Sequence, residues 1–124
     1  MTCFAYFFIL RENMASSNPL SNFELMVMLA LVRLGDEAYG VPIAEEIEAH
    51  SRRDVAVGSV YAALERLQSR GFVTSRVGEA TAERGGRAKR YFKITGKGLK
   101  VVQKTHQTLM SLWNGLPKLQ GGKV

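Results

Sequence analysis

The sequence predicts a mainly helical protein with one small β-hairpin, an α+β fold. In residues 58–70 the apolar side chains recur at positions i, i+4 and i+7, which puts them on one face of a helix. Residues 72–77 and 90–95 are rich in β-branched and aromatic side chains, as strands are. The polar, basic and glycine-rich loop 78–89 joins them and belongs at the surface. A helix followed by a basic hairpin is the arrangement of a winged helix-turn-helix.

Length and composition indicate one globular domain. The chain has 124 residues, of which 46% are hydrophobic and 23% are charged, so global disorder is not expected. A chain of this size buries roughly two-thirds of its unfolded surface, which makes a modest core but leaves little room for a large catalytic pocket.

The net charge of +6 is unevenly distributed along the chain. Residues 1–51 carry two arginines against seven acids, a balance of −5, whereas residues 52–93 carry ten basic side chains against four acids, +6. Residues 94–124 add five lysines and no acid. Basic charge therefore gathers on the helix, the hairpin and the C-terminal segment, as expected of a protein that binds a polyanion. A solvated basic face is the alternative interpretation.

Residues 1–20 precede the patterned part of the chain and are interpreted as an N-terminal extension. The apolar run from Cys3 to Leu10 is far shorter than the ~20 residues that span a bilayer, and no basic segment precedes it. This extension is expected to be disordered or to arise from a misplaced start: residues 1–13 would then be an upstream extension or the product of a wrongly chosen start codon, with Met14 as the natural start. The alternative is a short apolar helix or strand that packs on a partner. Cys3 is the only cysteine, so no intrachain disulfide can form, and a cytoplasmic location is expected.

The first predicted helix opens with a capping box. Ser21 stands three residues before Glu24, and the residues that follow, up to Leu34, are apolar nearly all round. A surface helix shows a single apolar stripe, so this helix must be covered on two sides. One side of the helix can pack against the rest of its own domain, and the other side is a candidate subunit interface. Gly35 is the predicted C-terminal stop.

The second helix is predicted from Val41 to about His50, with Pro42 in its first turn, where a missing N–H costs nothing. A linker, 51–54, and a short extended segment, 55–57, lead to the third helix. After the hairpin, Thr95 is a suitable N-cap. The long helix 97–115 that follows carries apolar side chains, together with His106, at spacings near three and four.

Three segments carry a resemblance to a known family: LALVRLGDEAYGVPIAEEIE, GSVYAALERLQSRGFV and GGRAKRYFKITGKG. In their order and spacing they resemble the PadR family of bacterial transcriptional regulators, over roughly Phe23 to Leu99. The resemblance implies a winged helix-turn-helix dimer joined through its first and last helices. It also implies repression of transcription, relieved by a small, often aromatic or toxic compound. Two features depart from the pattern: residues 1–20 lie outside it, and Ala88 interrupts the basic run of the hairpin, which is expected to weaken one contact there.

With the resemblance, the chain divides into four parts. These are the extension 1–20, a winged helix-turn-helix DNA-binding domain 21–95, a C-terminal dimerisation helix 96–117 and a basic tail 118–124.

The third helix supplies the first group of candidate DNA-binding residues. Free amides and the helix dipole at Gly58 and Ser59 favour a phosphate, although Ser59 would also suit an N-cap. The resemblance implies that Tyr61 lies near DNA, and packing against the hairpin is the alternative. Ala62 could meet a thymine methyl group, and Arg66 is better placed for a phosphate than for a base edge.

The hairpin loop supplies the second group of DNA-binding residues, for which minor-groove or phosphate contact is expected; a solvated loop charge is the alternative. These residues are Arg84, Gly86, Arg87, Lys89 and Arg90.

Three further residues are candidates for binding an effector. The resemblance places the last helix at the dimer interface, where Trp113 could stack on a flat hydrophobic ligand. Met26 and Met110 would offer adaptable walls. Ordinary packing in the helix seam is the alternative for all three.

Neither catalysis nor a bound metal or other cofactor is predicted. His50, His106 and the distant Cys3 do not have metal-ligand spacing, and no nucleophile motif or phosphate-binding glycine loop is present. We therefore predict a cytoplasmic, homodimeric repressor that binds double-stranded DNA at an inverted repeat, does not associate with membranes and responds to a small hydrophobic effector. A winged-helix protein-interaction module is the alternative.

Overall fold

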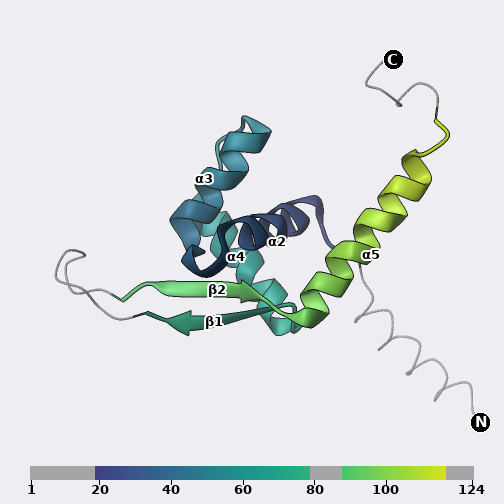
Figure 1. Ribbon diagram of the computed structural model, residues 1–124. Helices are drawn as coiled ribbons and strands as arrows, with labels where there is room; N and C mark the ends of the chain where they lie inside the picture. The colour runs from purple at the N-terminus through teal and green to yellow at the C-terminus, as the bar shows by residue number, and fades with distance from the viewer. Residues whose placement is uncertain (1–18, 79–87, 117–124) are drawn as a thin grey trace, which may run out of the picture.

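The structure is a computed structural model and describes residues 19–78 and 88–116. Three helices pack together, a two-stranded antiparallel hairpin lies beside them, and a fourth helix follows the second strand (Figure 1). This arrangement confirms the predicted mainly helical fold with one hairpin. The elements are α2 (Asn22–Leu34), the 3-10 helix η1 (Gly35–Glu37), α3 (Gly40–Ser51), α4 (Val57–Ser69), β1 (Val73–Val77), β2 (Arg90–Ile94) and α5 (Gly96–Trp113).

Helix α2 begins with the predicted capping box. The backbone N–H of Glu24 donates to Ser21 Oγ at 3.1 Å, and the N–H of Ser21 donates to Glu24 Oε1 at 2.9 Å. The helix ends at Gly35, whose φ of 63° is readily adopted by glycine. Leu29 and Val32, on the second side of this apolar helix, are 45% and 50% exposed, so a single chain leaves that side open.

The hydrophobic core lies between α2, α3, α4 and the hairpin. Helix α4 contributes its apolar stripe to it, and the stripe is fully buried as predicted. The buried hydrophobic residues are Val27, Met28, Ala30, Leu31, Ala38, Ile43, Ala44, Ile47, Val60, Ala63, Leu64, Leu67, Phe72, Val73 and Phe92.

Helix α4 ends in a Schellman motif. Gly71 has φ of 80°, its N–H donates to the carbonyl of Gln68, and the N–H of Phe72 donates to the carbonyl of Leu67. Phe72 is thereby held at the helix end and becomes a buried core residue. For this reason β1 starts at Val73, one residue later than the sequence predicted.

The hairpin pairs Val73 with Ile94 and Val77 with Arg90. It is attached to the helical body because the N–H of Phe92 donates to the carbonyl of Ala38 at 2.8 Å. The hairpin therefore has a fixed place beside η1 and the start of α3.

Helix α5 is joined closely to the end of the hairpin. Thr95 caps it as predicted, since its Oγ1 accepts from the N–H of Gly98 at 3.0 Å. The N–H of Thr95 donates to the carbonyl of Phe72 at 2.9 Å. From there α5 extends away from α3 and α4 (Figure 1). Val101 and Val102, in its first half, pack against the core, whereas the apolar side chains further along are exposed, Leu112 to 70%.

Candidate nucleic-acid interface

The exposed side of α4 carries all five residues that the sequence assigned to DNA contact on this helix. Because α4 buries a single stripe against the core, the side chains on its other positions reach the surface. The exposed candidates are Gly58, Ser59, Tyr61, Ala62 and Arg66.

The N-terminus of α4 lies one residue earlier than predicted. The helix starts at Val57 and its N-cap is Ala56, which makes no side-chain capping bond. Ser59 is thus the third helical residue, and its N–H donates to the carbonyl of Ala56 at 3.0 Å. The alternative in which Ser59 is the N-cap is therefore wrong, and its exposed hydroxyl is available at the positive end of the helix dipole.

Tyr61 lies between α4, the hairpin and α3. Its ring centroid is 6.1 Å from that of Phe92 on β2, with the two ring planes at 61°. At Gly40, the first residue of α3, an added Cβ would lie 2.5 Å from Cε2 of Tyr61. Tyr61 packs on the hairpin, as one interpretation expected, and remains 38% exposed.

Arg66 is engaged by the protein itself. Its Nε lies 3.0 Å from Oε2 of Glu24 on α2, and the arginine side chain is 55% exposed while that of Glu24 is 9% exposed. Burial would raise the pKa of Glu24, but hydrogen bonds from Ser21 and Arg66 outweigh it and hold that pKa below its usual value of 4.5. Arg66 is therefore oriented by Glu24 rather than free in solvent.

The root of the hairpin carries a cluster of cations and aromatic rings. Lys89 Nζ lies 2.6 Å from the hydroxyl oxygen of Tyr39 and 3.9 Å from the centroid of its ring. Tyr39 contacts Tyr91 edge to face, with the centroids 5.7 Å apart. The guanidinium of Arg76 stacks 4.7 Å from the Tyr91 ring centroid. Lys89 is therefore half-buried against Tyr39.

Arg90, by contrast, is exposed at the start of β2. The remaining hairpin candidates, Arg84, Gly86 and Arg87, lie outside the described residues.

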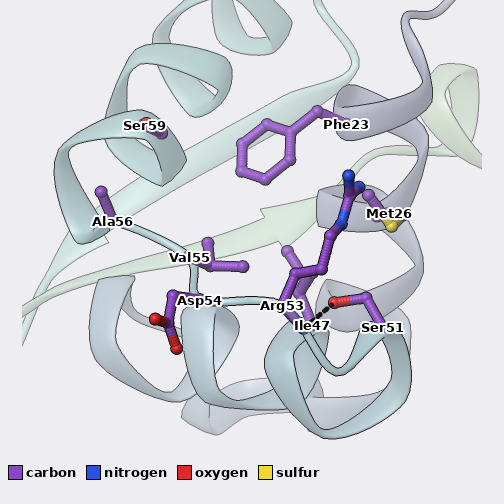
Figure 2. Close-up of a pocket in the computed structure, with 9 residues that line it drawn as sticks. All are labelled: Phe23, Met26, Ile47, Ser51, Arg53, Asp54, Val55, Ala56 and Ser59. Carbon is purple, nitrogen blue, oxygen red and sulfur yellow. Dashed lines mark hydrogen bonds between the residues drawn. The ribbon is translucent and has the colours of Figure 1, made fainter.

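A cavity that the sequence did not predict opens beside the N-terminus of α4. It has a volume of about 330 Å³ and lies between the ring of Phe23 on α2 and the turn that connects α3 to α4. Figure 2 shows Arg53 reaching across the cavity from this turn, whereas Asp54 directs its carboxylate outward. Ser59 lines the same cavity.

The sequence did not indicate a role for Arg53, because its place at the cavity depends on a backbone turn without a glycine signal. That turn passes through Arg52, which has φ of 58° and ψ of 30°. Among the described residues, Arg52 is the only one other than glycine with positive φ.

The structure does not bring the three effector candidates together within one chain. Met26 lies between α2 and α3, where it lines both the cavity beside α4 and a second apolar groove of about 340 Å³. Trp113 and Met110 lie 49% and 45% exposed near the far end of α5. Figure 1 shows this end pointing away from α2.

No metal-binding cluster of three or more His, Cys, Asp or Glu occurs within residues 19–78 and 88–116. None of the helices in those ranges combines the length and the apolar character that a bilayer crossing requires.

Comparison with known proteins identifies the family. A model of the transcriptional regulator PadR-like family matches residues 28–104, which is more than half of the chain. The chain belongs to the PadR-like family of transcriptional regulators. No curated protein matches the sequence significantly.

Solved structures share the winged-helix fold of this PadR-like protein. A PadR-like transcription factor from Bacteroides fragilis is 24% identical, with a TM-score of 0.61 over 83% of this chain and 90% of the other. A PadR family regulator from Eggerthella lenta is 23% identical, with a TM-score of 0.61 over 94% and 96%. A transcriptional regulator from Clostridium thermocellum is 20% identical, with a TM-score of 0.62 over 88% and 98%.

Proposed function

We propose that this PadR-like protein represses transcription as a homodimer that binds an inverted-repeat operator in double-stranded DNA. The observation that carries the proposal is the contact of Tyr61 on α4 with Phe92 on β2. This contact sets the exposed side of α4 next to the hairpin, so one surface can serve both a groove and the adjacent backbone. The charge of +6 within residues 52–93 suits such a surface to a polyanion.

In this proposal α4 enters the major groove and presents Gly58, Ser59, Tyr61 and Ala62 to it. A helix in the major groove is bordered by two phosphate backbones, and the hairpin would contact one of them. The proposed contacts are Lys89 and Arg90, together with Arg84, Gly86 and Arg87 of the loop.

The second backbone would be met on the other side of α4. There Arg66 is held by Glu24, and Arg53 reaches over the cavity beside Ser59. Arg53 and Arg66 are therefore proposed as phosphate contacts, and binding should weaken steeply with salt, with a log–log slope of roughly −0.9 per phosphate neutralised.

The dimer would be formed by α2 and α5, each of which exposes large apolar side chains. Leu29 and Val32 on α2 are about half exposed, as are Leu109 and Trp113 on α5. These apolar side chains contribute little to the stability of one chain while they are exposed to water, whereas a second copy of the chain would bury them. Two-fold symmetry then sets the two half-sites about one helical turn of DNA apart.

A small hydrophobic effector would bind where α5 meets the partner subunit. Trp113, Met110 and Met26 are the proposed contacts. In this proposal the pairing of two chains brings Trp113 and Met110 of one subunit close to Met26 of the other. Trp113 is the only tryptophan, so its fluorescence reports on this region directly. Titration with flat aromatic compounds should quench it; no change with any of them would leave Trp113 a packing residue.

The deciding experiment is an electrophoretic mobility shift with the DNA upstream of the protein's own gene, at several salt concentrations. We expect a specific complex whose affinity falls steeply with salt, and reduced transcription from that DNA in a reconstituted assay. Absence of a complex at low salt would favour the alternative function, a winged-helix module that binds another protein.

A further inference from the structure

The exposed side of α4 has a central line of four residues. Positions 58, 62, 65 and 69 are separated by four, three and four residues and therefore share one face, opposite the buried Val60 and Leu67. Three of the four side chains on this line are very short, namely those of Gly58, Ala62 and Ser69. Glu65 is the one long polar side chain at the centre of the exposed face.

Two of the longer residues that flank this line are engaged by the protein, whereas Gln68, at the edge of the face beside Tyr61, is exposed. Tyr61 packs against Phe92 and the start of α3, and Arg66 pairs with Glu24 at 3.0 Å. The side chain of Glu65, by contrast, makes no hydrogen bond or ion pair with any other residue of the described part of the chain. Glu65 is thus the one long side chain on the central line, and it is free to extend outward.

A carboxylate in this position is unfavourable against a polyanion unless it accepts a hydrogen bond. The phosphates offer no donors, so a partner must come from a base edge in the major groove. There, cytosine presents only its N4 amino group, whereas the N6 amino group of adenine lies next to the acceptor N7, which repels a second acceptor. An ionised carboxylate, which only accepts, is therefore matched to cytosine.

We propose that Glu65 determines sequence specificity by accepting a hydrogen bond from N4 of one cytosine in each half-site. The proposal rests on the proposed function, because it requires α4 to lie in the major groove. Phosphate contacts supply affinity for any sequence, and Glu65 lowers that affinity for every site in which its carboxylate finds no amino group.

The test is a selection from randomised DNA duplexes with the wild-type dimer, Glu65→Gln and Glu45→Gln. Glu45 is exposed on α3, so its substitution removes the same charge away from the exposed face of α4. The wild type should select cytosine at one position of each half-site and discriminate against a replacement there by about tenfold. Glu65→Gln should lose this discrimination and shift the preference toward adenine, because an amide both donates and accepts. Glu45→Gln should keep it.

The same base preference in Glu65→Gln and the wild type, with only a uniform change in affinity, would overturn the assignment and leave the proposed function standing. A wild-type protein that selects no sequence at all would overturn both.

Discussion

The guanidinium of Arg66 on α4 lies 3.0 Å, from Nε to Oε2, from the carboxylate of Glu24 on α2. Glu24 also completes the capping box of α2, so one buried carboxylate connects the start of the first helix with the exposed side of the third. The pair thereby couples the orientation of α4 to that of α2, which exposes Leu29 and Val32.

This pair predicts a pH dependence of stability. The pKa of Glu24 is lowered in the folded protein, so its stabilising contribution is present above pH 4.5 and is lost as the pH falls through the lower folded pKa. Glu24→Gln keeps a capping side chain but removes the charge. It should lower the free energy of unfolding by about 1 kcal/mol at pH 7. The difference from the wild type in urea unfolding should vanish in acid; a difference that persists at pH 2 would contradict the role of the charge.

A second prediction concerns the joint between the hairpin and α5. Gly98 packs so closely on the backbone carbonyl of Phe72 that a Cβ has no room. Gly98→Ala should destabilise the protein by about 1–3 kcal/mol, because backbone must move. Gly96, two residues earlier in the same helix, has nothing within 4 Å of an added Cβ. Gly96→Ala should be neutral or slightly stabilising, and equal melting temperatures for the two variants would refute the packing argument.

A third prediction concerns the backbone conformation of Arg52. This residue adopts the left-handed conformation at the C-terminus of α3, which glycine adopts without strain. Arg52→Gly should raise the free energy of unfolding by up to about 1 kcal/mol. Arg53→Gly, the neighbouring substitution, should gain nothing from left-handed geometry. Thermal unfolding of both variants measures the difference, and a less stable Arg52→Gly would contradict the expected strain.

Arg53 provides a fourth prediction. If Arg53 contacts a phosphate, Arg53→Ala should weaken binding to all duplexes and reduce the magnitude of the salt slope by roughly 0.9. Lys104 is exposed on α5, and Lys104→Ala removes the same charge at a distance from α4. Anisotropy titrations at four salt concentrations would compare the two; identical slopes would exclude a contact by Arg53.

A fifth prediction tests the pairing of chains. Leu112 is 70% exposed, so a charge at this position costs a single chain little. Leu112→Glu should leave the helical circular dichroism spectrum intact and give a monomer in sedimentation velocity, because a dimer interface would have to bury the charge. Gln107→Glu, also exposed but on the other side of the same helix, serves as a control. A Leu112→Glu variant that remains dimeric would place the interface elsewhere.

Local signals account for the parts of the fold that the sequence predicted. The Ser21 capping box and the Thr95 cap each involve residues three positions apart, glycines mark the helix ends, and the two strands follow from runs of β-branched and aromatic residues. The family resemblance predicted from the motifs is confirmed by the family match.

Partners far apart in the sequence could not be predicted in this way. Glu24 and Arg66 are 42 residues apart, and Tyr39 and Lys89 are 50 apart. No periodicity connects such residues, because only the packing of separate elements brings them together. Arg53 remained hidden for a related reason, since its turn passes through an arginine at a position where glycine is the usual signal.

The hydrogen bonds around Thr95 leave little freedom between the hairpin and α5. Its N–H is bonded to Phe72, and its hydroxyl donates to the carbonyl of Gly71 and accepts from Gly98. Helix α5 is therefore rigidly connected to the hairpin and to the helices that pack against it. If two copies pair through α5 as proposed, a molecule bound at the far end of this helix would change the distance between the two α4 helices without contacting either of them.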